Sequence, residues 1–294
     1  MTGQWHTIPT PDGREVEVLV EGPEDGLAWV FQHGTPSAAV SYQPLLDVAQ
    51  ARELRLIQYS RPGYGSSSPI PGRTVAAAAA DVRSVLDHLG HDRFVTVGWS
   101  GGGPHALACA ALLPERCLAA ATLAGVAPFD ADGLDFLEGM GAENHEEFGA
   151  ALAGKDELEE WLTTVGAAMA DVTGDQVAQS MGDLIAPVDA RYLDAGLGDY
   201  VAASFRHALS AGIAGWRDDD LAFTEPWGID LGAITVPVAI WQGGQDRMVP
   251  YAHGKWLAAH VAGATVHLHD DEGHLSLVAQ LDRIADDLLS HAQR

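Results

Sequence analysis

Ser100 lies in the segment VGWSGGG (Val97–Gly103), between the strand-like run RFVTVG and an Ala-rich helical pattern. A serine hydroxyl attacks a carbonyl carbon once a neighbouring base removes its proton. The pattern G-x-S-x-G between a strand and a helix is typical of a sharp turn that presents the serine, because small neighbours let the two elements approach each other. A serine in a glycine-rich loop can also be a simple connection. The prediction that Ser100 is a nucleophile therefore depends on its partners.

Two suitable partners follow later strand-like runs. Asp246 comes after the apolar run of VPVAIWQGGQDRMVP, and His274 lies in DDEGHLSL after the last such run. Histidine accepts a proton near neutral pH, and a carboxylate bonded to the ring holds the required tautomer and stabilises the imidazolium. Taken alone, Asp246 could be a turn residue and His274 one of 13 histidines. Their positions after two strands, in the order Ser100, Asp246, His274, predict a catalytic triad.

An acyl-transfer site also needs donors for the oxyanion. Gly101 follows the serine at the start of the helix and offers one backbone N–H. We expect the second N–H from Thr35 in HGTPSAAV, the loop after the run LAWVFQHG. His33 in the same loop is expected to brace it through hydrogen bonds rather than to act as the base.

These residues require an alternation of strands and helices to bring them together. Strand-like runs occur at 15–22, 27–34, 54–60, 93–99, 117–125, 236–244 and 264–270, and helical patterns at 74–90, 102–113, 254–262 and 275–292. Such alternation predicts an α/β fold, with a mostly parallel sheet covered by helices on both faces. Ligands gather at the carboxyl ends of the strands in such sheets.

The alternation is interrupted between residues 127 and 231. This stretch has helical patterns (156–170 and 190–209) and no convincing strand. We expect residues 1–126 and 232–294 to form the core domain and residues 127–231 a helical cap. The stretch carries 22 Asp and Glu against 4 Lys and Arg, so most of the net charge of −25 resides there. A well-solvated surface is the favoured interpretation. Attraction of a cationic substrate is the alternative.

Composition excludes several other classes. A net charge of −25 disfavours nucleic acid and anionic membrane surfaces as partners. Cys109 and Cys117 are expected to be buried thiols, since two cysteines make no disulfide framework. No apolar run has the length of a membrane span, and the first residues, MTGQWHTIPTPDG, lack the pattern of a secretory signal. We expect a cytoplasmic enzyme that uses no cofactor or metal and acts on a small molecule. Its oligomeric state stays open.

Several side chains could shape a pocket or simply pack. Trp99, beside the nucleophile, fits either role. The acidic residues 270–272 before His274 fit a solvated turn better than a device that raises its pKa. Five residues of the 127–231 stretch could line an acyl pocket, although their spacing favours packing for most of them: Leu137, Met140, Trp161, Met169 and Met181.

Five segments together resemble the α/β-hydrolase superfamily over nearly the whole chain: HGTP, RPGYGSSS, GWSGG, GGQDRMVP and EGHLSL. The resemblance implies an eight-stranded sheet and a helical cap between strands six and seven. Ser60 stands where relatives commonly have Asp, in a segment that is chiefly a structural turn. Ser100 argues against epoxide hydrolases and haloalkane dehalogenases of this superfamily, which use Asp as the nucleophile.

The sequence therefore predicts a serine hydrolase that cleaves a small-molecule ester or lactone through an acyl-enzyme. An aminopeptidase similar to proline iminopeptidase would explain the acidic stretch, but GWSGG differs from the G-G-S-W-G pattern of those enzymes. A perhydrolase or a carbon–carbon bond hydrolase would use the same triad. A ligand receptor that keeps the triad without turnover is a further alternative.

Overall fold

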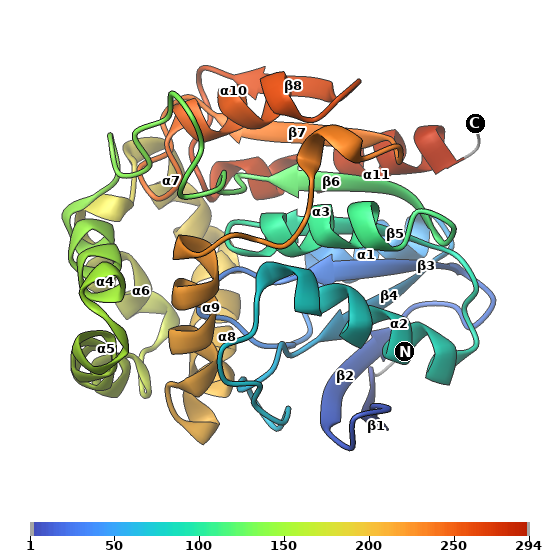
Figure 1. The fold of residues 1–294 in the computed structure, drawn as a ribbon, viewed down its shortest axis with the longest axis horizontal. Helices are drawn as coiled ribbons and strands as arrows, with labels where there is room; N and C mark the ends of the chain where they lie inside the picture. Colours follow the sequence, from blue (N-terminus) through green and yellow to red (C-terminus); the bar gives the residue numbers. More distant parts are fainter. Residues whose placement is uncertain (1–2, 293–294) are drawn as a thin grey trace.

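Eight strands form one mostly parallel sheet in the order β1–β2–β4–β3–β5–β6–β7–β8 (Figure 1). The computed structural model describes residues 3–292. Strand β2 pairs antiparallel with β1 and β4, and the remaining neighbours pair in parallel. The predicted α/β fold class is confirmed. The strands are β1 (Gln4–Pro9), β2 (Glu15–Glu21), β3 (Leu27–Gln32), β4 (Leu54–Tyr59), β5 (Phe94–Trp99), β6 (Cys117–Leu123), β7 (Val238–Gly243) and β8 (Thr265–His269).

Both faces of the sheet are covered by helices, because its central strands are apolar on both sides. In β5, Val95 and Val97 pack in one apolar cluster and Phe94 packs in the other. Residues of α1 (Gln43–Ala51) and α11 (Leu281–Ala292) belong to the first cluster. The second cluster includes residues of α2 (Ala78–Leu89), α3 (Gly102–Leu112) and α10 (Tyr251–His260).

Three local features differ from the sequence expectations. Helix α10 begins at Tyr251 rather than near residue 254, because Pro250 adopts an extended conformation directly before it. The last helical pattern starts as a 3₁₀ helix over Ser276–Gln280, and the α-helix begins only at Leu281. The short helix α1, with Pro44 in its first turn, was not anticipated.

The chain between β6 and β7 forms six α-helices within the described residues, here called the inserted helices. They are α4 (Ala142–Ala153), α5 (Lys155–Met169), α6 (Gly174–Ser180), α7 (Pro187–Tyr192), α8 (Gly198–Ala208) and α9 (Ala214–Thr224). Figure 1 shows them beyond the edge at which β3, β6 and β7 end. They therefore lie over the carboxyl ends of the parallel strands. Their definition as a separate cap domain stays a prediction.

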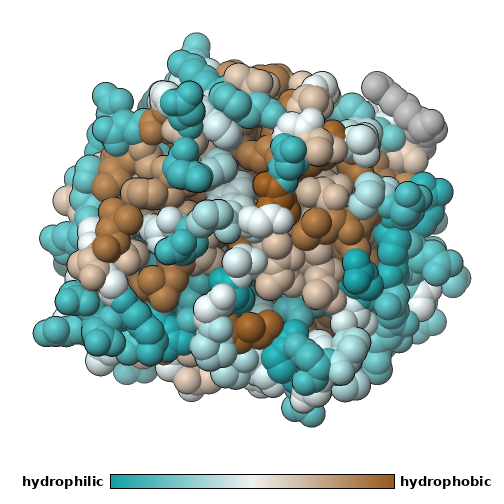
Figure 2. All heavy atoms as spheres, viewed as in Figure 1, coloured by the Kyte–Doolittle hydropathy of each residue, from teal (hydrophilic) through white to brown (hydrophobic). Residues whose placement is uncertain are grey.

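The acidic residues of the inserted helices fall into two groups. Asp156, Glu157 and Glu160 on α5 are exposed, and hydrophilic residues cover that corner of the molecule, at the lower left of Figure 2. Asp189 on α7 and Asp218–Asp220 on α9 are instead buried. The expectation of a solvated acidic surface is therefore wrong for these four residues. A buried carboxyl needs partners that compensate for its lost hydration.

Both cysteines, Cys109 and Cys117, are buried free thiols, as expected. Across residues 3–292, the structure contains no helix with the length and apolar character needed to cross a membrane.

Candidate active site

Ser100 occupies a strained turn between β5 and α3. Its φ is +56°, which is unusual for a residue with a side chain. Its N–H donates to the Leu123 carbonyl over 2.8 Å, and its own carbonyl accepts from the Gly103 N–H over 2.9 Å. The neighbouring glycines are sterically required: a Cβ atom at Gly98 would lie 2.1 Å from the Gly102 carbonyl oxygen. The turn predicted from GWSGG is therefore present.

His274 and Asp246 are joined as their positions in the sequence predict. The distance from Nδ1 of His274 to Oδ2 of Asp246 is 2.8 Å, and both residues are buried. The Asp246 carboxylate also accepts the N–H groups of Met248 and Val249 over 2.9 and 2.8 Å, and Nε2 of Gln242 over 3.1 Å. These donors hold the carboxylate in place. Because Nδ1–H of His274 donates a hydrogen bond to Asp246, Nε2 of the neutral His274 ring is free to act as a base.

A second carboxylate supports the loop that carries His274. Asp189 on α7 is fully buried and accepts three backbone N–H groups: those of His274 (3.1 Å), Leu275 (2.9 Å) and Ser276 (2.8 Å). Burial lowers the pKa of His274, but the charge and hydrogen bond of Asp246 and the charge of Asp189 outweigh it, so this pKa lies above its usual value. The sequence reasoning missed Asp189, since a single Asp in a helical pattern carries no signal for this contact.

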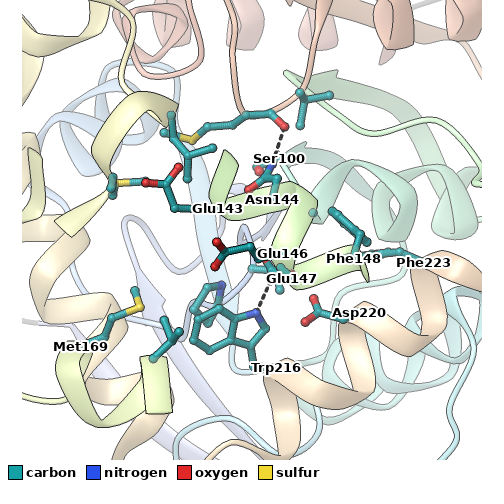
Figure 3. Close-up of a pocket in the computed structure, with 18 of the residues that line it drawn as sticks. Ser100, Glu143, Asn144, Glu146, Glu147, Phe148, Met169, Trp216, Asp220 and Phe223 are labelled. Atoms are coloured by element: carbon teal, nitrogen blue, oxygen red, sulfur yellow. Dashed lines mark hydrogen bonds between the residues drawn. The ribbon is translucent and has the colours of Figure 1, made fainter. Parts of the chain in front are cut away.

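Two adjoining cavities bring the candidate residues together. The smaller, about 50 Å³, is lined by Ser100, His274 and Trp99 among others. The larger, about 280 Å³, is lined by Ser100, Thr35 and Gly101 and extends among the inserted helices (Figure 3). Ser100 and Thr35 therefore face both cavities, whereas His274 lines only the smaller one and Gly101 only the larger one.

Thr35 and Gly101 lie against each other beside the serine. A Cβ atom at Gly101 would lie 2.5 Å from Oγ1 of Thr35, and one at Gly34 would lie 3.4 Å from the Ser100 Cβ. The loop after β3 therefore approaches the start of α3 closely. That approach is the arrangement that two backbone donors to one oxyanion require.

A buried guanidinium fixes the loop that contains Thr35. Arg61, which is 2% exposed, donates to the carbonyls of His33 and Gly34, the latter over 2.7 Å, and to Oγ1 of Thr35 over 3.0 Å. The expectation that the His33 ring braces this loop by hydrogen bonds is wrong: neither ring nitrogen has a partner among the described residues. Instead the ring packs edge-on against Phe31, and burial lowers its pKa to about 3.

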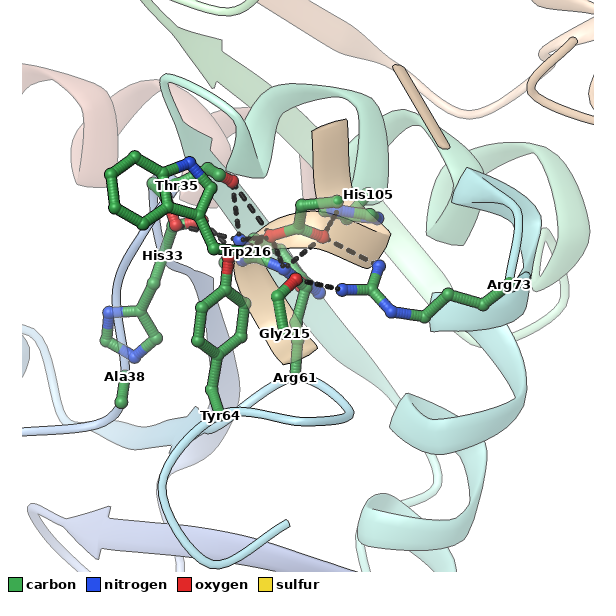
Figure 4. Close-up of polar contacts among 12 residues, drawn as sticks. His33, Thr35, Ala38, Arg61, Tyr64, Arg73, His105, Gly215 and Trp216 are labelled. Carbon is green, nitrogen blue, oxygen red and sulfur yellow. Dashed lines mark hydrogen bonds and ion pairs between the residues drawn. The ribbon is translucent and has the colours of Figure 1, made fainter. Parts of the chain in front are cut away.

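Asp219 on α9 neutralises Arg61 and ties the inserted helices to the sheet. Its carboxylate lies 2.6 Å from guanidinium nitrogens of both Arg61 and Arg73, and it accepts the hydroxyls of Thr35 and Tyr64, each over 2.8 Å (Figure 4). Burial alone would raise the pKa of Asp219, but the charges of Arg61 and Arg73 hold it well below its usual value. The run RDDDL (217–221), which lies between Trp216 and Phe223, is the available sequence signal for buried acids.

The wall of the larger cavity is both acidic and aromatic. Four carboxyl side chains line it: Glu143, Glu146, Glu147 and Asp220. Five aromatic side chains line it as well: Phe148, Phe205, Phe223, Trp161 and Trp216. Nε1 of Trp216 donates to Glu147 over 2.6 Å (Figure 3). Burial raises the pKa of Glu147 to about 7, although the hydrogen bonds with Trp216 and Asp220 oppose the shift.

The structure also separates pocket residues from packing residues. Trp161, Met169 and Met181 pack against apolar clusters, as expected, and they also line the larger cavity, so packing is not their whole role. Met140 and Leu137 belong to the apolar core beside the sheet. Within residues 3–292, no three His, Cys, Asp or Glu side chains are grouped as a metal ion would require.

Comparisons with known proteins bear on the family and the fold of the chain. A model of the alpha/beta hydrolase fold family matches residues 30–279. The chain is 29% identical over 287 residues to a non-heme chloroperoxidase from Streptomyces lividans, covering 97% of this chain and 98% of the relative. It is 25% identical over 278 residues to a 2-hydroxy-6-oxononadienedioate/2-hydroxy-6-oxononatrienedioate hydrolase from Klebsiella pneumoniae, covering 92% and 84% of the two chains.

A solved structure shares the fold. A thermophilic esterase from Thermogutta terrifontis superposes with a TM-score of 0.67 at 22% sequence identity, covering 100% of this chain and 98% of that one. The relatives carry different activities in one architecture, so they support a hydrolase and leave its substrate open. The family match spans most of the chain, including the turn at Ser100 and the loops of Asp246 and His274, and the protein therefore belongs to the α/β-hydrolase fold family.

Proposed function

We propose that the protein is a serine hydrolase that cleaves a small-molecule ester or lactone through an acyl-enzyme. The observation that carries the proposal is the position of Ser100, on a strained turn that faces a cavity shared with His274. His274 is in turn bonded to the buried Asp246 over 2.8 Å. A nucleophile, a base and a carboxylate that orients the base are the parts that acyl transfer needs.

Each step follows from these groups. Oγ of Ser100 attacks the carbonyl carbon while Nε2 of His274 takes its proton. The backbone N–H groups of Gly101 and Thr35 stabilise the oxyanion. The tetrahedral intermediate expels the alcohol, which takes its proton from His274. A water molecule, deprotonated by His274, then attacks the acyl-enzyme and releases the acid and Ser100.

We further propose that residues 127–231 act as a cap over this site, with residues 1–126 and 232–294 as the core. The inserted helices contribute most of the wall of the larger cavity, through residues such as Phe148, Trp161 and Phe205. An enclosing apolar wall excludes water from the reacting groups and shapes the acyl pocket.

The test is labelling with a fluorophosphonate probe together with turnover of a chain-length series of p-nitrophenyl esters. We expect stoichiometric labelling and ester turnover in the wild type. In Ser100→Ala, labelling should be lost and kcat should fall about 10⁶-fold. Ser84→Ala is the control, because this serine lies on α2 and its hydroxyl bonds only the Ala80 carbonyl.

The other outcomes separate the alternatives. Labelling without ester turnover would favour an aminopeptidase or a carbon–carbon bond hydrolase, the latter being the activity named for the Klebsiella relative. Turnover with peracid formation in the presence of hydrogen peroxide would favour a perhydrolase. A folded protein that is not labelled would contradict the proposal and favour a ligand receptor.

A further inference from the structure

The larger cavity has a one-sided charge. Glu143, Glu146, Glu147 and Asp220 all line it, and none of the described residues in its wall is Lys, Arg or His. A cavity whose charges are of one sign attracts a ligand of the opposite sign. Charge alone does not define a site, because exposed carboxylates are simply hydrated. The burial and the partners of the individual carboxyls therefore decide whether a ligand is required.

The three consecutive aspartates of α9 differ in their partners. Asp218 pairs with Arg217 over 2.7 Å, and Asp219 pairs with Arg61 and Arg73. Within the described part of the chain, no Lys or Arg pairs with Asp220, although this residue is only 1% exposed. Its Oδ2 is buried and accepts no hydrogen bond. Figure 3 shows the Asp220 carboxyl directed from α9 into the cavity.

Glu147 on α4 is the polar neighbour of Asp220. Nε1 of Trp216 holds one Glu147 oxygen over 2.6 Å, so the side chain is fixed beside the cavity. Asp220 is buried and Glu147 is half-buried, and two adjacent carboxyls in such surroundings are not both ionised without a positive charge between them, so in its absence they share a proton. A cation bound there would replace that proton. The pair is therefore suited to a single positive charge.

The apolar wall selects the kind of cation. Trp161 and Trp216 meet edge to face with ring centroids 6.0 Å apart, and Phe148 and Phe223 line the same cavity. Aromatic faces attract an alkylammonium group, whose hydration shell is weak. A metal ion would need more oxygen ligands in a regular geometry than this pair of carboxyls supplies. The wall thus matches an organic ammonium better than an inorganic cation.

We propose that Glu147 and Asp220, with the rings of Trp161 and Trp216, bind the ammonium group of a cationic substrate. This proposal rests on the proposed hydrolase function. The ammonium belongs to the acyl part of the ester. His274, which protonates the leaving alcohol, lines only the smaller cavity, whereas the four carboxyls and Gly101 line only the larger one, and Ser100 lies between the two.

The test compares two isosteric esters, methyl 4-(trimethylammonio)butanoate and methyl 5,5-dimethylhexanoate, by proton release. They differ only in whether a nitrogen cation or a neutral carbon bears the three methyl groups. We expect kcat/KM to be higher for the cationic ester by on the order of 10- to 100-fold. This range corresponds to the contribution of a charged group that is hydrogen-bonded or enclosed by aromatic rings. An equal or lower kcat/KM for the cationic ester would overturn the proposal.

Variants separate a local site from the general field of an acidic protein. Glu147→Gln and Asp220→Asn should each lower the cationic-to-neutral ratio of kcat/KM about ten-fold or more, and the ratio cancels any general effect on turnover. Glu160→Gln removes an equal charge from the exposed side of α5 and should leave the ratio unchanged. If Glu160→Gln lowers the ratio as much as the other two variants, the preference comes from net charge and the site is refuted.

A second pair of esters tests whether the cation belongs to the acyl part or to the alcohol part of the substrate. Choline acetate and 3,3-dimethylbutyl acetate carry the same isosteric difference on the alcohol. The proposal expects a ratio near one for this pair. A preference confined to choline acetate would overturn the assignment of the cation to the acyl part.

A binding measurement makes the test independent of turnover. Tryptophan fluorescence of Ser100→Ala is titrated with tetramethylammonium chloride, with sodium chloride at equal ionic strength as the control. Saturable quenching that is weakened by Asp220→Asn supports the cation site even if no ester is hydrolysed. Hydrolysis of the neutral ester without any response to the cation supports the hydrolase and overturns the cation site.

Discussion

The carboxylate of Asp189 accepts the backbone N–H of His274 over 3.1 Å, although 85 residues separate the two in the chain. Asp189 comes from α7, one of the inserted helices, and His274 from the loop after β8. The two further N–H bonds from Leu275 and Ser276 make Asp189 the acceptor for the whole start of the following 3₁₀ helix. The inserted helices therefore help to set the position of the candidate catalytic base.

Replacing Asp189 should affect both rate and pH dependence. Asp189→Asn keeps one acceptor oxygen but directs an N–H₂ group at a backbone donor, so the His274 loop should shift. We expect kcat to fall on the order of 10- to 100-fold, as for a misplaced catalytic group. Loss of the negative charge should also lower the pKa of His274 and move the acid limb of activity to lower pH. The pH profile of kcat/KM measures this shift.

Asp175→Asn is the control for Asp189→Asn, because it removes an exposed carboxylate from the neighbouring helix α6. A merely structural role for Asp189 would lower Tm without moving the acid limb. Unchanged kcat and an unchanged pH profile in Asp189→Asn would show that the carboxylate does not position His274.

The wild-type pH profile is itself a prediction. His274 acts as a base in its neutral form, and its pKa is raised above the ordinary value of 6.5. Activity should therefore be lost as the pH falls through a pKa above 6.5 and should level off above it. Asp246→Asn removes the charge that raises this pKa, so the acid limb should move to lower pH and kcat should fall about 10⁴-fold. An acid limb that stays in place in Asp246→Asn would argue that another group titrates.

Arg61 should be essential for both stability and rate. Arg61→Lys loses the guanidinium N–H groups that bind Asp219 and the carbonyls of His33 and Gly34 at the same time. The lysine ammonium keeps the positive charge but not these hydrogen bonds, so the free energy of unfolding should fall by less than the about 3–5 kcal/mol that removal of one partner of a buried ion pair costs. Without these bonds the Thr35 loop should move, which displaces a candidate oxyanion donor. We therefore expect the variant to lower kcat more than it raises KM. Denaturant unfolding and steady-state kinetics measure the two effects.

Arg52→Lys serves as the matched control for Arg61→Lys. Its partners Asp282 and Asp286 are exposed, and such pairs contribute about 0–1 kcal/mol. If the two variants unfold at the same denaturant concentration, the buried network does not hold the loop as described.

Two glycine-to-alanine variants should change stability in opposite directions. A Cβ at Gly102 would lie 2.1 Å from the backbone oxygen of Gln32, so Gly102→Ala forces β3 and α3 apart and should destabilise the fold strongly. At Gly149 on α4 nothing lies within 4 Å, and Gly149→Ala should raise the free energy of unfolding by about 0.5–1 kcal/mol. Thermal unfolding compares the two. If Gly102→Ala is as stable as Gly149→Ala, the turn at Ser100 does not require a glycine at position 102.

Local sequence patterns were sufficient for strands β2 to β8 and for the candidate triad, but not for β1 (Gln4–Pro9), where no strand-like run was identified. The strained turn at Ser100 was predicted from a strand pattern, a helix pattern and small residues within a few positions of each other. The places of Asp246 and His274 follow from the rule that loops after parallel strands meet at one edge. Each of these features depends on residues that are near in the chain or on a general property of parallel sheets.

The partners of the inserted helices could not be obtained in this way. Asp219 and Asp220 are adjacent in the sequence and both are buried, yet Asp219 is paired with two arginines, whereas Asp220 faces a cavity with no Lys or Arg partner among the described residues. The helix orientation decides this difference, because successive residues point about 100° apart around its axis. The packing of α9 on the sheet then selects which carboxylate meets Arg61.

The sequence by itself determined the order of elements, the strained serine turn and the residues that stand at the strand ends. Only the tertiary structure decided that Asp189 holds the His274 loop and that Arg61 rather than His33 holds the Thr35 loop. It also decided that Asp220 meets no Lys or Arg within the described part of the chain. The physical reason is that these contacts join residues far apart in the chain. Burial makes each of them strong, and no local pattern records which distant partner a buried charge will meet.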